Sequence, residues 1–468
     1  MIKYLCIIFI IADAIYSFNQ FYTTPLDGDL AGGIVPAEEV KLILEDPFGI
    51  KVIFEKKLNP NPNKFFAHYT FYKYFNFTPF IFQKFTTAIN SIYLSCALIK
   101  LIAQLGFIFM LSLFIGENKL KLFNNDHLLI ICLVTPLLQT YGYNGFMGLI
   151  DKSSTYLFFY GIPLLLYLVF VYLFLSLKNK KHKTPSILTY TRYILLAILT
   201  IILPFSGPLI PPIILISSFL LFIKQFTINQ PFKIYKSLIN NKLQAIYLLT
   251  ICLLSFYSIY LGTYNTQNVI EHLPLTERYS HLLNGIPLLF FQKLGFPILF
   301  IVLTLNYLIL RRLDTKSYKT MLCFYKYTLL FIAIYLFLLP LGGYRSYRPH
   351  IIRFDTALPI TVLLLFIYGK STYVIFNQLK QHKKKYLILI FTILFIYTNA
   401  DRSALNENNC ERTALNYIVN SDDEIVYLPF DCSVLEWKPI TDPQKSKLNS
   451  ELLYLWNITA DKKLFYTD

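Results

Sequence analysis

The feature of this sequence that most constrains its fold is a series of long apolar runs, among them residues 156–177, 243–261, 294–310 and 327–339. About 20 apolar residues in an α-helix cross the roughly 30 Å of hydrocarbon in a bilayer. Transmembrane strands would alternate apolar and polar residues, and these runs do not. The chain is therefore expected to be an all-α protein that crosses a membrane many times.

Composition supports the same expectation. Hydrophobic residues make up 55% of the chain and charged residues only 15%. A soluble domain of this length does not normally carry so much apolar surface. The lipid bilayer is thus the expected solvent for most of the chain.

The formal net charge of +16 is distributed in short polar breaks between the apolar runs. Clustered Lys and Arg are also typical of proteins that bind a nucleic-acid backbone. Here the clusters follow the pattern that marks cytoplasmic loops, which argues against a nucleic-acid partner. These clusters lie at residues 178–183, 233–242, 311–319 and 380–385.

With the basic clusters as cytoplasmic markers, we expect about eleven transmembrane helices. They are residues 4–17, 94–116, 127–140, 156–177, a hairpin over 193–223 that counts as two, 243–262, 294–310, 321–340, 357–369 and 386–399. Prolines interrupt the hairpin, which must return to the same side either as two crossings or as a re-entrant element. The first segment is either a span or a cleaved signal peptide, and both leave the following loop outside.

This topology divides the chain into a multi-span domain, residues 1–399, and an outer soluble segment, residues 400–468. The long first outer loop, residues 19–86, contains a short helix over 36–45 and an aromatic-rich stretch from Phe65 to Phe85, which is typical of interfacial helices. The C-terminal segment has too many aromatic and aliphatic residues for solvated coil. We expect it to form a small outer α/β cap.

The cap region contains Cys410 and Cys432. An outer location would permit a disulfide between them, and two free thiols are the alternative. The other five cysteines lie in or near apolar runs, where a thiol behaves as a small hydrophobe.

An acidic turn follows the first apolar segment. In the sequence Pro25-Leu-Asp-Gly-Asp29, the glycine allows both Asp27 and Asp29 to face one cation or one hydroxyl. The alternative is a turn with two solvated acids. Glu45 and Asp46 form a second acidic pair in the same loop, which either contributes to binding the substrate or is a simple helix end before Pro47.

A cluster of basic residues precedes a late span, on the side where few are expected. Arg345, Arg348 and Arg353, together with His350, lie between Gly342 and Asp355. The planar fork of arginine suits a clamp for a phosphate or diphosphate. Alternatively, Arg353 and Asp355 pair with Asp27 or Asp46, or the arginines bind lipid headgroups.

Other charged residues are less specific. Glu277 and Arg278 are either a pair that contacts a sugar donor or a solvated local ion pair. Lys100, near the end of a span, is expected to extend its ammonium group toward the membrane surface, with phosphate binding as the alternative. Asp151 and Lys152 are expected to be solvated loop residues.

Several chemistries lack support. The sequence has no Walker-type phosphate loop, no Gly-x-Ser-x-Gly elbow and no His-Glu-x-x-His zinc helix. The centres of the expected spans are almost uniformly apolar, which argues against a channel or a proton pump.

Together, the acidic motif in the first outer loop, the many hydrophobic segments, the arginine-rich late loop and the soluble C-terminal piece resemble the integral-membrane GT-C glycosyltransferases. Such enzymes transfer a sugar from a polyprenyl-phosphate carrier to a lipid, glycan or protein acceptor at the outer face of the membrane. The resemblance implies that Asp27 or Asp29 is the general base or a ligand of Mg²⁺ or Mn²⁺. It also implies that Arg345, Arg348 and Arg353 hold the carrier phosphate.

Two other functions remain open. A polysaccharide polymerase or ligase would use a lipid diphosphate-linked donor, and a transporter or assembly component would have no catalytic residues. High use of Lys, Ile, Phe, Tyr and Asn is typical of an AT-rich bacterial genome, so the inner membrane of a bacterium is the expected location.

Overall fold

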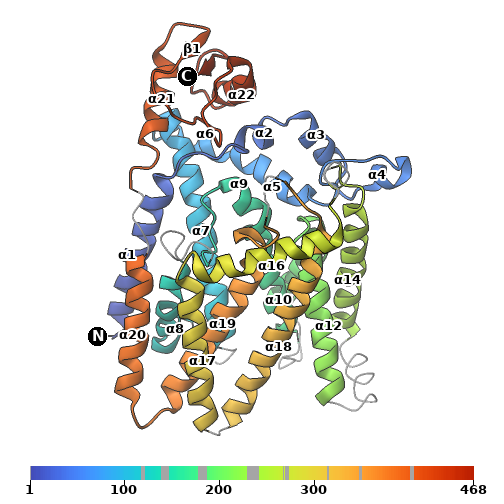
Figure 1. Ribbon diagram of the computed structural model, residues 1–468, viewed down its shortest axis with the longest axis vertical. Coiled ribbons are helices and arrows are strands. Elements are labelled where there is room, and N and C mark those ends of the chain that lie inside the picture. The colour runs from blue at the N-terminus through green and yellow to red at the C-terminus, as the bar shows by residue number, and fades with distance from the viewer. Residues whose placement is uncertain are drawn as a thin grey trace.

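Long helices form a bundle that is covered at one end by short helices and by the C-terminal residues (Figure 1). The computed structural model describes residues 2–116, 122–138, 147–177, 187–228, 242–266, 268, 273–313, 316–346, 350–400 and 405–468. The bundle consists of α1 (Ile2–Tyr22), α7 (Ala88–Gly116), α8 (Asn125–Val134), α10 (Ile162–Ser176), α11 (Ile187–Ile202), α12 (Ile210–Ile228), α14 (Lys242–Gly262), α17 (Gly295–Leu313), α18 (Lys316–Leu338), α19 (Phe354–Gln378) and α20 (Lys383–Ala400). Short turns η2 (Thr135–Leu138), η5 (Leu203–Phe205) and η6 (Leu339–Gly342) continue some of them.

In the described part of the chain, seven apolar helices are long enough to cross a membrane. They are Lys3–Tyr22, Ala88–Gly116, Ser154–Ser176, Lys242–Gly262, Gly295–Leu313, Tyr318–Gly342 and Phe354–Gln378. The pair α11 and α12 also qualifies, with a bend of 120° at the prolines, and brings the number to eight if it counts as one span. An all-α, multi-pass membrane protein is therefore confirmed, and the total of eleven spans stays a prediction.

Burial distinguishes the centre of the bundle from its surface. In α19, 78% of the most apolar stretch is buried, against 17% in α1 and in α18. Large side chains such as Ile8, at 63% exposed, lie on the outside of the bundle. In a bilayer such apolar surface faces lipid, whereas backbone polar groups are satisfied inside each helix.

The first loop and the C-terminal residues form a second layer at one end of the bundle. The loop contains α2 (Leu30–Ile34), α3 (Glu38–Glu45), α4 (Ile50–Glu55), α5 (Phe65–Phe75) and α6 (Thr78–Phe82). The cap, residues 405–468, contains α21 (Asn409–Asn420), β1 (Ile425–Tyr427), η7 (Pro443–Ser446), α22 (Lys447–Leu455) and β2 (Leu464–Tyr466). The two strands pair in parallel, with Val426 opposite Phe465. A mixed helix-and-strand cap is thus confirmed.

Loop and cap share one hydrophobic core, which is separate from the core of the bundle. Trp456 is fully buried in it, and its indole N–H donates to the carbonyl of Phe75 at 3.1 Å. Gln83 in turn donates to the carbonyl of Trp456 at 2.6 Å. The cap is therefore folded onto the first loop rather than tethered beside it.

The cap contains a disulfide, which decides between the two alternatives that the sequence left open. Cys410 and Cys432 are bonded, with their Cα atoms 5.9 Å apart and a sequence separation of 22 residues. The bond ties α21 to the segment that follows β1.

Replacing both cysteines, as Cys410→Ser with Cys432→Ser, is expected to lower the free energy of unfolding of the cap by about 3 kcal/mol, because a loop of this length is no longer closed in the unfolded state. Both tryptophans of the chain, Trp437 and Trp456, lie in the cap. Tryptophan fluorescence during urea unfolding therefore reports on the cap and on its contacts with the first loop and with Tyr156. Cys252→Ser, in α14, is the control, and an unchanged midpoint in the double variant would contradict the prediction.

Candidate active site beneath the cap

Asp27 is buried, with only 5% of its surface exposed. The hydroxyl of Thr155 donates to Oδ1 at 2.6 Å, and the backbone N–H of Thr155 donates to Oδ2 at 3.2 Å. Burial raises the pKa of Asp27, and the two bonds from Thr155 oppose that rise. The fold therefore holds one carboxylate in a fixed orientation where a proton is bound more tightly than in water.

Asp29 lies in different surroundings, because its side chain is exposed at the start of α2. Its backbone N–H donates to Oδ1 of Asp27 at 3.3 Å, which closes the turn. The sequence could not distinguish the two acids. In the structure, Asp27 is buried and Asp29 is exposed.

Thr155 belongs to α9 (Ser154–Tyr156), a short turn that continues into the π-helical turn η4 (Leu157–Gly161) and then into α10. Ser153 caps α9 by accepting from the N–H of Tyr156 at 3.1 Å. Single π-helical turns occur frequently at functional sites. This irregular start of a span brings Thr155 against Asp27.

The cap covers the acidic turn. Gly28 lies so close to the cap that an added Cβ would come within 2.6 Å of the Trp437 ring and 2.7 Å of the Trp437 backbone nitrogen. The Trp437 ring stacks on Tyr156 at 5.8 Å and remains 53% exposed. An aromatic surface thus borders the turn that contains Asp27.

Gly28→Ala is expected to lower the free energy of unfolding of the cap by about 1–3 kcal/mol, because the added methyl group meets backbone that cannot move independently. Gly32→Ala is a matched control in the same segment, since its Cβ would meet only Leu448 at an ordinary 3.8 Å. Urea midpoints of tryptophan fluorescence compare the two. Equal midpoints would show that the cap does not depend on this contact.

Lys100 of α7 lies behind the acidic turn. It is 1% exposed, its ammonium group donates to the carbonyl of Lys152, and its charge acts on Asp27. The expectation that it extends to the membrane surface is wrong, because the loop before α9 folds over it and supplies a carbonyl in place of water.

Asp151 is also part of this cluster and is not the solvated loop residue that was expected. It accepts from the N–H of Ser153 at 2.8 Å. Burial raises the pKa of Asp151 to about 6, and the negative charges of Asp355 and Asp27 contribute to the rise. Asp151 is therefore within electrostatic range of Asp27, Asp355 and Lys100.

Arg353 reaches the same cluster from the start of α19. Its Nε and Nη2 donate to the two oxygens of Asp355 at 2.7 and 2.9 Å. Asp355 is 5% exposed and the Arg353 side chain 27%. The partner of Arg353 is therefore Asp355, rather than the predicted Asp27 or Asp46. Two of its five N–H donors are engaged in this pair.

The other basic residues of the predicted clamp have different surroundings. Arg345 donates to the side-chain oxygen of Asn268 at 3.1 Å and to the carbonyl of Tyr344 at 2.6 Å. Arg348 lies outside the described residues. His350 packs against Gly285 of α16 (Leu275–Phe291), and its buried Nδ1 has no hydrogen-bond partner among the described residues. A phosphate clamp of the three arginines stays a prediction.

Arg278 and Glu277 begin α16, which runs across the bundle in Figure 1. Arg278 donates to the carbonyls of Leu273 at 2.7 Å and Pro340 at 3.4 Å. Glu277 is exposed. Arg278 thus holds two backbone segments together.

Asp46 and Glu45 have structural surroundings as well. Asp46 is 8% exposed and accepts from the N–H groups of Ile50 at 2.9 Å and Lys51 at 2.8 Å, which caps α4. Glu45 is the last residue of α3 and lies 3.8 Å from the Lys51 ammonium. These contacts favour the helix-end alternative for this pair.

The sequence did not indicate two further basic residues, Lys64 and His68, which the loop buries at 7% and 6% exposure. The Lys64 ammonium lies 3.5 Å from the ring centre of Phe159, and the His68 ring lies 4.5 Å from it. Neither ring nitrogen of His68 has a hydrogen-bond partner in the described part of the chain. Their four-residue spacing at the start of the aromatic stretch was the only available signal.

Glu411 connects the cap to the acidic turn and to the bundle. It is 3% exposed and accepts from the N–H of Leu26 at 2.9 Å, the N–H of Leu435 at 3.1 Å and the hydroxyl of Tyr93 at 2.7 Å. Burial raises the pKa of Glu411 to about 7. One buried carboxyl group thus joins three parts of the chain next to Asp27.

A cation held by Asp27 and Asp29 stays a prediction. Within the described residues, no group of three or more His, Cys, Asp or Glu side chains is arranged to hold a metal ion. Asp27 is turned toward Thr155, whereas Asp29 is exposed.

Comparison with protein-family models, curated proteins and solved structures found no match. What the protein does is therefore inferred from its own residues.

Proposed function

We propose that this protein is a membrane glycosyltransferase that moves a sugar from a polyprenyl-phosphate carrier to an acceptor hydroxyl at the outer face of a bacterial inner membrane. The acceptor is a lipid, a glycan or a protein. The observation that carries the proposal is the buried Asp27 carboxylate, which is oriented by Thr155 where the bundle meets the cap.

Asp27 has the properties of a general base. Thr155 and the N–H of Asp29 use three of the roughly four acceptor positions on its carboxylate. The remaining position, on Oδ2, suits the hydroxyl of an acceptor. A raised pKa brings the group closer to the pH at which the enzyme works, which is where proton transfer is most effective.

The proposed reaction transfers one proton and one glycosyl group. The acceptor hydroxyl gives its proton to Asp27, and its oxygen forms a bond to the anomeric carbon of the sugar. The bond between that carbon and the carrier phosphate breaks, and its electron pair leaves with the phosphate oxygen. Positive charge near the leaving phosphate stabilises the transition state, and Lys100 and Arg353 are the cations of this cluster.

Ligand-dependent thermal unfolding of the purified protein in detergent tests the proposal. Polyprenyl phosphate and polyprenyl-phosphate sugars are compared with polyprenol, which has the same tail and no phosphate. At 100 times its Kd, a ligand of the folded state stabilises by about 2.7 kcal/mol. We expect a saturable shift with the phosphates only, and a smaller one in Arg353→Lys, which keeps the charge opposite Asp355 but loses the planar fork.

Three other outcomes would contradict this expectation. A shift with a lipid diphosphate-linked oligosaccharide alone would favour a polymerase or ligase. Equal shifts with polyprenol and polyprenyl phosphate would show binding of the tail without phosphate recognition. No shift with any carrier would favour a non-catalytic membrane component.

A further inference from the structure

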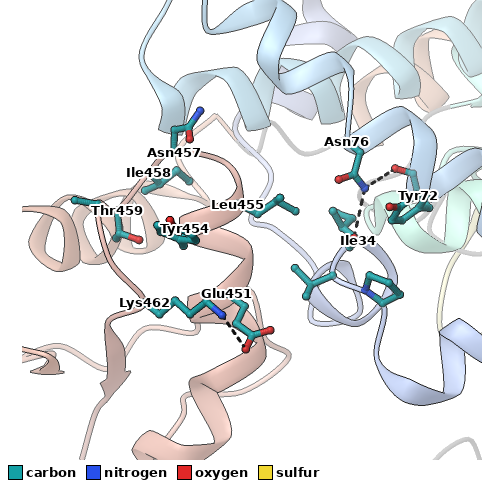
Figure 2. Close-up of a pocket in the computed structure, with 13 residues that line it drawn as sticks. Ile34, Tyr72, Asn76, Glu451, Tyr454, Leu455, Asn457, Ile458, Thr459 and Lys462 are labelled. Carbon is teal, nitrogen blue, oxygen red and sulfur yellow. Dashed lines mark hydrogen bonds and ion pairs between the residues drawn. The ribbon is translucent and has the colours of Figure 1, made fainter.

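A groove of about 750 Å³ lies between the cap and the first loop, apart from the Asp27 cluster (Figure 2). One wall is formed by the end of α2 and by α5, and the other by α22 and the turn that follows it. Its volume is that of a site for a small molecule or a short chain of sugars. None of the residues considered for catalysis lines it.

The groove walls combine aromatic rings and uncharged polar groups with aliphatic side chains, among them Ile34, Leu455 and Ile458. Tyr72 and Tyr454 contribute rings, and Tyr454 is 48% exposed. Tyrosine presents an apolar face and a polar hydroxyl to a ligand at the same time. Sugars have the matching properties, since their C–H faces pack on rings and their hydroxyls form hydrogen bonds.

Two polar side chains of the groove differ in their hydrogen bonding. The Asn76 amide N–H group donates to the carbonyls of Tyr72 at 2.9 Å and Ile34 at 3.4 Å, which orients the amide (Figure 2). Thr459 is 5% exposed, and its hydroxyl has no hydrogen-bond partner among the described residues. A buried hydroxyl without a partner costs free energy that a ligand can recover.

The two charged side chains of the groove neutralise each other. Glu451 and Lys462 form an ion pair at 3.4 Å on the cap wall of the groove. A phosphate-rich ligand such as a nucleic acid would require a surplus of Lys and Arg. A lipid tail would leave the polar groups that lie between the aliphatic ones without partners, namely those of Asn76, Asn457, Thr459, Glu451 and Lys462. The lining therefore favours a neutral, hydroxyl-rich ligand.

We propose that this groove binds a neutral glycan and that the bound glycan is the acceptor of the transfer reaction. Its role as acceptor rests on the function proposed above, whereas glycan binding does not. The helix α2 has five residues, so that its length is about 8 Å. Its N-terminal end follows Asp29 and its C-terminal end reaches the groove. A glycan in the groove thus lies one short helix away from the acidic turn.

The test uses the full chain in detergent on an array of short neutral oligosaccharides, with Tyr454→Ala and Thr459→Val as the groove variants. Tyr427→Ala is the matched control, since Tyr427 is 41% exposed on β1 and outside the groove. We expect the wild type and the control to bind the same glycans, and each groove variant to bind them about tenfold more weakly. Tryptophan fluorescence confirms that the cap of each variant is folded.

Two outcomes would overturn the glycan site: no glycan bound by the folded wild type, or equal binding by the wild type and both groove variants. If glycans bind but polyprenyl-phosphate sugars are neither bound nor consumed, the acceptor role fails together with the transferase, and the glycan site stands. If the transferase is active on other acceptors and ignores the bound glycan, only the acceptor role fails.

Discussion

Asp27→Asn is expected to lower kcat for sugar transfer by about 10²- to 10⁴-fold, the usual contribution of a general base. An amide cannot take a proton from the acceptor hydroxyl. It is nearly the same size as the carboxyl group and can still accept from the Thr155 hydroxyl, whereas the bond from the Thr155 N–H is lost. Thermal unfolding of the variant in detergent shows whether it is folded. The measurement is transfer of labelled sugar from the polyprenyl-phosphate donor that stabilises the wild type.

Asp29→Asn is the matched control, because it makes the same change two residues away on an exposed side chain. Its effect is expected to be several-fold at most. The wild type should lose activity as pH falls through the pKa of Asp27, which burial places above the ordinary 3.8. An Asp27→Asn enzyme with full activity would exclude Asp27 as the base, and a larger loss in Asp29→Asn would transfer the role to that residue.

Glu411→Ala is expected to destabilise the docking of the cap by at least about 3 kcal/mol. Without the carboxyl group, the N–H groups of Leu26 and Leu435 and the hydroxyl of Tyr93 lose their acceptor, and each unsatisfied buried group costs about 1–3 kcal/mol. The measurement is urea unfolding followed by tryptophan fluorescence. Limited proteolysis of the cap provides a second readout that does not depend on fluorescence.

Glu411 should also make the cap sensitive to pH. Its folded-state pKa of about 7 lies above its ordinary value of 4.5. The stabilisation is therefore fully present below pH 4.5 and is lost as pH rises through about 7, with a total change on the order of 3 kcal/mol. In Glu411→Gln, which cannot titrate, this dependence should disappear.

Glu424→Gln is the control for the pH experiment, since Glu424 is exposed at the edge of β1. Its pH profile should match that of the wild type. Identical profiles for the wild type and Glu411→Gln would show that this carboxyl group does not titrate with unfolding of the cap. Because Glu411 binds the backbone of Leu26, next to Asp27, loosening of the cap is expected to reduce transferase activity as well.

The location of the candidate site was predictable in part. An acidic turn after a first span and arginines before a late one were visible in the sequence. In the structure, Asp151 is within electrostatic range of Asp27 and of Asp355, the partner of Arg353. The partners of these residues were not predictable. Thr155 is 128 residues from Asp27, and nothing in its local sequence marks it.

The sequence by itself determined that the chain is helical and lies in a membrane. A backbone in lipid must satisfy its own hydrogen bonds, and a long apolar run can do so only as a helix, so that this conclusion depends on local composition alone. It also indicated the cap and permitted its disulfide, because those depend on composition and on cysteines within one short segment.

Only the tertiary structure decided which acid is buried, which cation is paired and where a ligand can bind. Asp27 and Asp29 have the same side chain and differ in what the rest of the chain places around them. Lys100 is enclosed by a distant loop, and the groove exists only because α22 packs against α2 and α5. The free energy of a charged or polar group is set by its neighbours in space, and sequence order does not reveal those neighbours.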